Sequence, residues 1–167
     1  IVDKICFVDP DVTVLEYRKN GSVVLGNSSK KKAELITELN EFRSEDVNFD
    51  ILSVQSFKDF SDYNMFATLN STFTELIRAK NNHLGDVFVP SKYNELVQIS
   101  KKLETNYFCF LGLTERNGKK VNSEFYMHII DISTGEFVHS ALTSFNGGVS
   151  SQSIKKYLMQ EINLLDF

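Results

Sequence analysis

The sequence contains little proline, glycine or cysteine. Its 167 residues include 2 Pro, 8 Gly and 2 Cys, and no Trp. A chain with so little proline and glycine is neither collagen-like nor a low-complexity disordered segment. The cysteines show no Cys-x-x-Cys spacing and no His at a metal-ligand interval, which excludes the usual zinc and thioredoxin-like sites. We expect Cys6 and Cys109 to be buried thiols in strands, with a disulfide between those strands as the alternative.

The sequence also lacks an excess of positive charge and a long apolar run. Its formal net charge is -4 and its pI is near 5.4, which argues against a nucleic-acid partner, because phosphate binding calls for a basic face. The one basic run, Lys30–Lys32, falls in the first turn of a predicted helix, and we interpret it as a solvated patch. No stretch approaches the roughly 20 apolar residues of a transmembrane helix.

The chain starts at Ile1 and not at an initiator Met. We expect a mature or trimmed chain, which is compatible with the earlier removal of a signal or lipid-attachment segment.

Hydrophobic residues are abundant, at 42% of the sequence with 14 Phe. A chain of this length typically buries roughly 70% of its unfolded surface, so we expect one core and a single domain, 1–167. Runs rich in apolar and β-branched residues predict strands at 5–8, 12–17, 22–25, 47–54, 87–89, 107–113, 121–132 and 136–145. Apolar residues at three- and four-residue intervals predict helices after Asn27, from Ser56, from Pro90-Ser91, and after a cap at Ser150 or Ser151.

This order of elements predicts an α/β (α+β) fold, a mixed sheet of about five strands with helices packed against it. The segment 107–113 is almost continuously apolar, which is typical of an internal strand covered on both faces. Asn20-Gly21 and Gly135 supply the conformations that tight hairpin turns require.

Candidates for chemistry are few. His128 and His139 lie on the two arms of the predicted C-terminal hairpin near Asp131, so a His/Asp cluster could form on one face, although a one-residue slip in register would separate them. No nucleophile accompanies them in a recognised motif. His83 is interpreted as a solvated loop residue.

Two polar features have structural interpretations. Glu34, Glu38 and Glu41 fall on helix positions that we expect to be exposed. The loop Asn146–Gly148 precedes a helix and could form a nest of backbone amides for an anion, but it lacks the Lys and the spacing of a phosphate-binding loop. We therefore assign no catalytic, cofactor-binding or metal residue and expect no cofactor.

The segment 91–145 resembles a known family of envelope domains. A helix ends in Leu103-Glu104-Thr105-Asn106-Tyr107, an apolar strand contains Phe110-Leu111-Gly112, and a hairpin turn carries Asp131, Thr134, Gly135 and Glu136. These features are similar to those of TolB amino-terminal regions and of envelope lipoproteins of the curli-secretion (CsgG-like) and penicillin-binding-protein-activator (LpoB-like) type. The first strand departs from the family, because it runs into Asp9-Pro10-Asp11.

The resemblance implies a bacterial cell-envelope protein on the periplasmic side, often lipid-anchored, that works through contacts with a protein partner and has no catalytic residues. We therefore predict a non-enzymatic protein-binding or assembly module. The alternative is a small-molecule-binding or hydrolytic domain that uses the His/Asp cluster of His128, Asp131 and His139.

Overall fold

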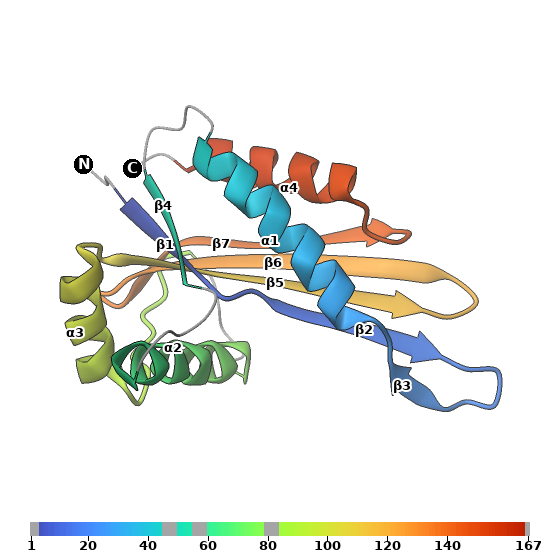
Figure 1. The fold of residues 1–167 in the computed structure, drawn as a ribbon, viewed down its shortest axis with the longest axis horizontal. Coiled ribbons are helices and arrows are strands. Elements are labelled where there is room, and N and C mark those ends of the chain that lie inside the picture. Colours follow the sequence, from blue (N-terminus) through green and yellow to red (C-terminus); the bar gives the residue numbers. More distant parts are fainter. Residues whose placement is uncertain (1–3, 45–49, 55–59, 79–83, 166–167) are drawn as a thin grey trace. The chain divides into compact units, whose positions relative to one another are not determined.

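The computed structural model describes residues 4–44, 50–54, 60–78 and 84–165. In chain order the elements are β1 (Lys4–Val8), β2 (Asp11–Tyr17), β3 (Val23–Leu25), α1 (Ser28–Ser44), β4 (Asp50–Val54), α2 (Phe60–Arg78), α3 (Tyr93–Leu103), β5 (Tyr107–Asn117), β6 (Val121–Asp131), β7 (Glu136–Asn146) and α4 (Ser151–Asn163) (Figure 1). The predicted α/β class with a mixed sheet is confirmed. Within these described ranges the sheet has seven strands, where about five were expected.

Strand β5 is internal, as its apolar sequence predicted. It runs parallel to β1 over its first residues, with Ile5 aligned to Tyr107, and parallel to β2 over its later residues, with Asp11 aligned to Gly112. Strand β6 pairs with both β5 and β7, β4 pairs in parallel with β1, and β3 pairs antiparallel with β2. The side chains from Phe108 to Leu111 are fully buried.

Residue contacts divide the chain into two compact units. Unit 1 comprises Ile1–Asp9, Asn48–Leu111 and Met127–Ser140; unit 2 comprises Pro10–Val47, Gly112–Tyr126 and Ala141–Phe167. Strands β5, β6 and β7 each contribute residues to both units. The expected single domain therefore stays a prediction.

The core of unit 1 is apolar and aromatic. Helices α2 and α3 pack against each other, and the rings of Phe73 on α2 and Phe110 on β5 lie 5.3 Å apart. Leu69, Leu76 and Leu96 are also buried. Of the apolar side chains on α2, Leu69, Phe73 and Leu76 are buried, Met65 and Phe66 are half-buried, and Ile77 is 45% exposed.

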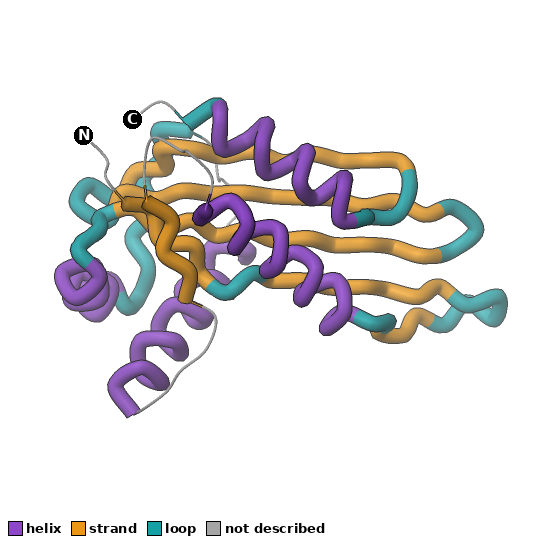
Figure 2. Tube along the Cα trace, turned by 45° about the horizontal axis from the view of Figure 1, so that its top comes forward, coloured by secondary structure: helices purple, strands orange, loops and turns teal. Residues whose placement is uncertain are grey.

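In unit 2, helices α1 and α4 pack against each other, and α1 also packs against β2 (Figure 2). The ring of Tyr157 on α4 stacks on Phe125 of β6 with centroids 4.3 Å apart. Phe125 also meets Phe145 of β7 edge to face at 5.3 Å. These contacts fix α4 on the sheet residues of its own unit.

The local signals for turns and caps are confirmed. Gly21 and Gly135 have φ values of +82° and +77°, which favour glycine. Ser150 caps α4 in a reciprocal pair with Ser153, and the side-chain oxygen of Asn27 accepts from the backbone N–H of Lys30 at 3.1 Å.

The predicted strand 87–89 is wrong, because this segment forms only one antiparallel bridge, between Val87 and Glu136. The next residue, Pro90, has no N–H with which to extend a ladder. The predicted helix start at Ser56 lies outside the described residues. In the part of the chain that is described, no helix is both long and apolar enough to cross a membrane.

Candidate functional site

His128 is buried and hydrogen-bonded inside unit 1. Its Nδ1 lies 2.8 Å from Oγ of Ser140, its ring meets Phe137 edge-on with centroids 5.7 Å apart, and it is 8% exposed. Burial, together with nearby His139, lowers the pKa of His128 to about 4. The 2.8 Å between His128 Nδ1 and Ser140 Oγ is within the distance at which a catalytic base activates a nucleophile. However, a base this weak is neutral at pH 7 and accepts a proton poorly.

Asp131 organises the turn between β6 and β7. Its Oδ1 accepts from the backbone N–H of Ser133 at 2.9 Å and from its Oγ at 2.6 Å, and its carbonyl accepts from Gly135 N–H at 2.7 Å. Oγ1 of Thr134 accepts from the backbone N–H of Glu136 at 3.2 Å. Asp131, Thr134 and Gly135, on which the family resemblance rests, therefore all have structural roles in this turn.

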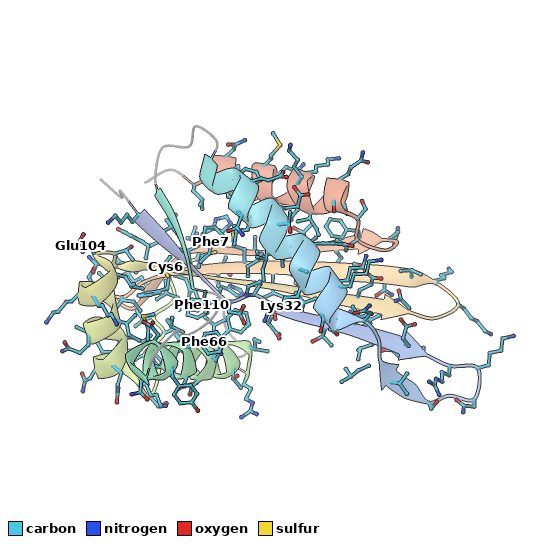
Figure 3. All side chains as sticks on the ribbon, in the orientation of Figure 1. Cys6, Phe7, Lys32, Phe66, Glu104 and Phe110 are labelled. Atoms are coloured by element: carbon cyan, nitrogen blue, oxygen red, sulfur yellow. The ribbon has the colours of Figure 1, made fainter. Side chains whose placement is uncertain are left out.

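Both thiols are buried in unit 1, as predicted. Cys6 and Cys109 are free and fully buried, and Figure 3 shows Cys6 beside Phe7 on β1. Burial raises the pKa of Cys6 to about 12 and raises that of Cys109 well above its ordinary value. Because the thiolate is the reactive form, neither residue is placed to act as a nucleophile.

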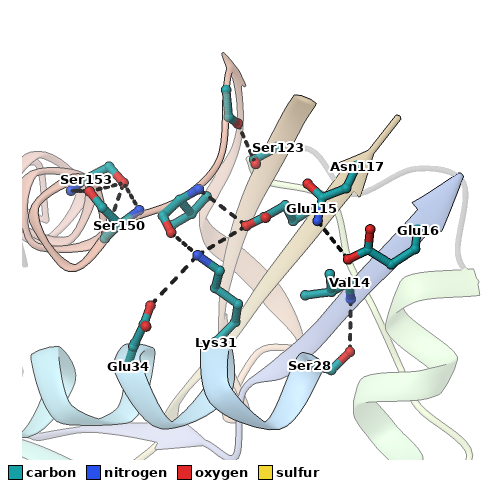
Figure 4. Close-up of polar contacts among 12 residues, drawn as sticks. Val14, Glu16, Ser28, Lys31, Glu34, Glu115, Asn117, Ser123, Ser150 and Ser153 are labelled. Carbon is teal, nitrogen blue, oxygen red and sulfur yellow. Dashed lines mark hydrogen bonds and ion pairs between the residues drawn. The ribbon is translucent and has the colours of Figure 1, made fainter. Parts of the chain in front are cut away.

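A carboxylate of this chain lies beside the loop that precedes α4 (Figure 4). Oε2 of Glu115 accepts from the backbone N–H of Val149 at 3.3 Å. The ammonium group of Lys31 lies 3.5 Å from the same oxygen and 3.9 Å from Oε2 of Glu34, and it donates to the carbonyl of Val149. Glu115 is 5% exposed.

This network changes the interpretation of two sequence features. Lys31 is not a solvated cation, because its side chain is 22% exposed and paired with Glu115. The loop Asn146–Gly148 is held by the N–H of Gly147, which donates to the carbonyl of Val121 at 2.8 Å, and by Oγ of Ser123, which donates to Gly147 at 2.8 Å. The backbone N–H of Val149, next to this loop, already donates to Glu115 and is therefore not available to an external anion.

Glu38 is a second buried carboxyl in unit 2. It is 9% exposed, not exposed as predicted, because its helix packs against α4. Its Oε2 is buried, and none of the described residues forms a hydrogen bond with it. Burial and the neighbouring Glu41 raise the pKa of Glu38, and Lys155 opposes the shift. Burial without full hydrogen bonding favours the neutral acid.

Tyr126 lies over a glycine in the sheet of unit 2. A Cβ added to Gly112 would come within 1.9 Å of Cζ of Tyr126, so only glycine leaves room for the ring. The phenol donates to Oδ2 of Asp11 at 2.9 Å, and Asp11 is aligned with Gly112 in the β2–β5 register. Burial, then Asp11, raises the pKa of Tyr126 well above its ordinary value. These three residues pack as a structural unit.

The described residues hold no group of three or more His, Cys, Asp or Glu that could bind a metal ion. The pair of Lys31 and Glu115 is not predicted by the sequence pattern. A signal was present, because Glu115 occupies the alternate position after the buried Leu113, where a strand with one covered face would carry an apolar residue.

The sequence matches no known family profile and no curated protein. Similar solved structures include the PelC dodecamer from Paraburkholderia phytofirmans, at 14% identity over 94% of this chain and 86% of that one, with a TM-score of 0.43. Lipoprotein GNA1162 from Neisseria meningitidis has 15% identity over 96% of this chain and 94% of that one, with a TM-score of 0.44. The LpoB C-terminal domain from Salmonella enterica has 15% identity over 88% and 86%, with a TM-score of 0.39.

These structures include the LpoB-like group that the sequence resembles. The LpoB-like part of the resemblance is thus represented among the similar structures, whereas its TolB-like and CsgG-like parts stay predictions. Identities and TM-scores this low assign no function to this chain.

Proposed function

We propose that this chain is a non-enzymatic protein-binding or assembly module of the bacterial cell envelope, on the periplasmic side. The observation that carries the binding role is an exposed apolar segment in unit 1, residues 84–89. Leu84, Val87 and Val89 are 69%, 63% and 66% exposed. Apolar side chains that gather on a surface mark sites of interaction with other proteins more often than isolated ones do.

The segment is held in place by its own backbone. The N–H of Gly85 donates to the carbonyl of Phe137 at 2.9 Å, the N–H of Phe137 donates to Asp86 at 2.9 Å, and the N–H of Phe88 donates to Gly135 at 2.7 Å. The ring of Phe88 lies 6.0 Å from that of Phe137. Because Phe88 is anchored inward, its neighbours Val87 and Val89 face outward.

The next residues hold the other end of this segment. Pro90 is buried, and both the N–H and Oγ of Ser91 donate to the carboxylate of Glu75 on α2, with the Oγ bond at 2.9 Å. An ordered surface loses little conformational entropy on binding. Covering one valine or leucine side chain contributes roughly 1.5–3 kcal/mol, so this segment can supply a useful part of a binding free energy.

The envelope setting is supported by the sequence resemblance around Asp131, Thr134, Gly135 and Glu136, whose turn the fold builds as a defined structure. The hydrolytic alternative has less support. His128 is buried with a pKa near 4, and the carboxylate of Asp131 accepts from Ser133 within the turn.

In vivo cross-linking in the native cell, followed by identification of captured envelope proteins, tests the proposal. The double variant Val87→Ser/Val89→Ser should lose the captured partner. Its control is Val23→Ser/Leu25→Ser, which replaces one valine and one leucine, 49% and 75% exposed on β3, with serine. Equal capture by both double variants, or no specific partner for the wild-type chain, would contradict the proposal.

A further inference from the structure

The outer edge of β7 is covered at one end of the strand. Val87 forms an antiparallel bridge with Glu136, and the backbone bonds of Gly85 and Phe88 to Phe137 and Gly135 accompany it. The chain thus adds a short antiparallel piece of its own backbone to the start of β7. On its other side, β7 pairs with β6.

Further along β7, the segment Ala141–Asn146 of unit 2 has β6 as its only pairing neighbour among residues 4–44, 50–54, 60–78 and 84–165. The outward-facing N–H and C=O groups of such an edge are a template for another extended chain. Exposed and half-buried positions alternate along it: Leu142, Ser144 and Asn146 are exposed, whereas Ala141, Thr143 and Phe145 are half-buried.

This edge lacks two protections that proteins commonly use. Natural edge strands are often guarded by charged residues, especially lysine, or by proline. From Phe137 to Asn146 the sequence contains no Asp, Glu, Lys, Arg or Pro. Strand β3, at another edge of the sheet, is by contrast only three residues long. Leu142, in the middle of the unguarded segment, is 68% exposed.

We propose that Ala141–Asn146 binds an extended, uncharged segment of a partner protein by strand addition, with an apolar partner side chain against Leu142. This inference rests on the proposed binding function and names a second surface for it. Backbone pairing selects an extended chain, and an uncharged edge selects an uncharged one. Six residues span about 20 Å, well short of the roughly 20–30 residues a side of a standard interface, so the edge alone suits a short strand better than a second copy of this chain.

The test uses the whole chain and a synthetic octapeptide of alternating threonine and valine, with one lysine at each end for solubility. Backbone amide NMR shifts are followed as the peptide is added to millimolar concentration. Saturable changes at Ala141–Asn146 are expected. They should be absent with the same peptide carrying a central proline, because proline removes a ladder donor.

Matched substitutions locate the site. Leu142→Lys adds a guarding charge to the edge and should weaken binding about tenfold or more. Leu25→Lys makes the same change at a leucine that is 75% exposed on β3 and should leave binding unchanged. Equal loss in both variants, no shift at millimolar peptide, or shifts confined to other residues would overturn the proposal.

A third result would also overturn it: the amides of Ala141–Asn146 shift with protein concentration when no peptide is present. In that case a second copy of the chain occupies the edge. If cross-linking finds a partner through Val87 and Val89 while the peptide fails to bind, only the strand-addition inference falls and the proposed function stands.

Discussion

Glu115→Gln tests whether the network beneath the α4 loop stabilises unit 2. The variant keeps an oxygen that can accept from Val149 N–H but removes the charge that faces Lys31. Breaking a buried ion pair costs about 3–5 kcal/mol when the remaining charge stays buried. Lys31 is 22% exposed and keeps Glu34 and the Val149 carbonyl, so we expect a smaller loss of about 2 kcal/mol in the free energy of unfolding.

Glu34→Gln is the matched control, because it removes the other carboxylate beside the same ammonium group. Its pair with Lys31 is an i,i+3 contact of 3.9 Å with the glutamate side chain 27% exposed. Such surface pairs contribute about 0.3 kcal/mol. Urea unfolding of the wild type and both variants measures the two free energies, and unchanged slopes show that the unfolded states are comparable.

The dependence of stability on salt distinguishes the Lys31–Glu115 pair from the Lys31–Glu34 pair. Added salt at about 1 M should screen the half-buried pair of Lys31 and Glu34 more than the pair of Lys31 with buried Glu115. The loss in Glu115→Gln should therefore persist at high salt. In a Lys31→Met background the cost of Glu115→Gln should fall to about zero or change sign, because the carboxylate is then a buried charge without its counter-charge. Equal losses in Glu34→Gln and Glu115→Gln, or a Glu115→Gln loss that salt abolishes, would refute the reasoning.

Three further predictions concern unfolding and reactivity. The folded-state pKa of His128 lies near 4, below its ordinary 6.5, so its contribution to stability is present above pH 6.5 and is lost as the pH falls towards 4; His128→Gln should shrink the difference between urea unfolding at pH 7 and pH 4 by about 3 kcal/mol. Gly112→Ala should lower the free energy of unfolding by about 3 kcal/mol, because its Cβ would lie 1.9 Å from Tyr126. In a Tyr126→Ala background the same substitution should cost less than about 1 kcal/mol, as a double-mutant cycle measures. Cys109 should react slowly with a thiol reagent at neutral pH and quickly in urea, because it is fully buried; fast labelling of the folded chain would contradict this.

Signals that act over a few residues predicted the fold well. The turns at Asn20-Gly21 and Gly135 depend on the φ values that glycine allows, and the Ser150 cap depends on its own helix terminus. The apolar run of β5 predicted an internal strand because its side chains need cover on both faces. Each of these inferences requires no knowledge of distant parts of the chain.

The polar sites depend on which helix covers which face, and periodicity alone does not decide that. Glu34, Glu38 and Glu41 are spaced by four and three residues, so they share one stripe of α1. Helix α4 packs beside α1 and leaves Glu38 buried while Glu41 stays exposed. For the same reason the sequence indicates a solvated Lys31, since its partner Glu115 lies 84 positions further along the chain.

The pKa shifts of four side chains all have burial as their largest cause. A general base or nucleophile works best with a pKa near the operating pH. Burial moves His128 down to about 4, moves Cys6 up to about 12, and raises Cys109 and Tyr126 above their ordinary values. Each shift moves the pKa further from pH 7 and favours the uncharged form of the group, as expected for packed core residues.

Glu38 is the exception, since its pKa rises from its ordinary value and so moves towards pH 7. Its folded-state pKa lies above the unfolded one, so its contribution to stability is present at low pH and is lost as the pH rises through the folded value. A catalytic acid needs access to substrate, and Glu38 is 9% exposed between helices α1 and α4. The raised pKa therefore reflects a carboxyl group covered by helix packing.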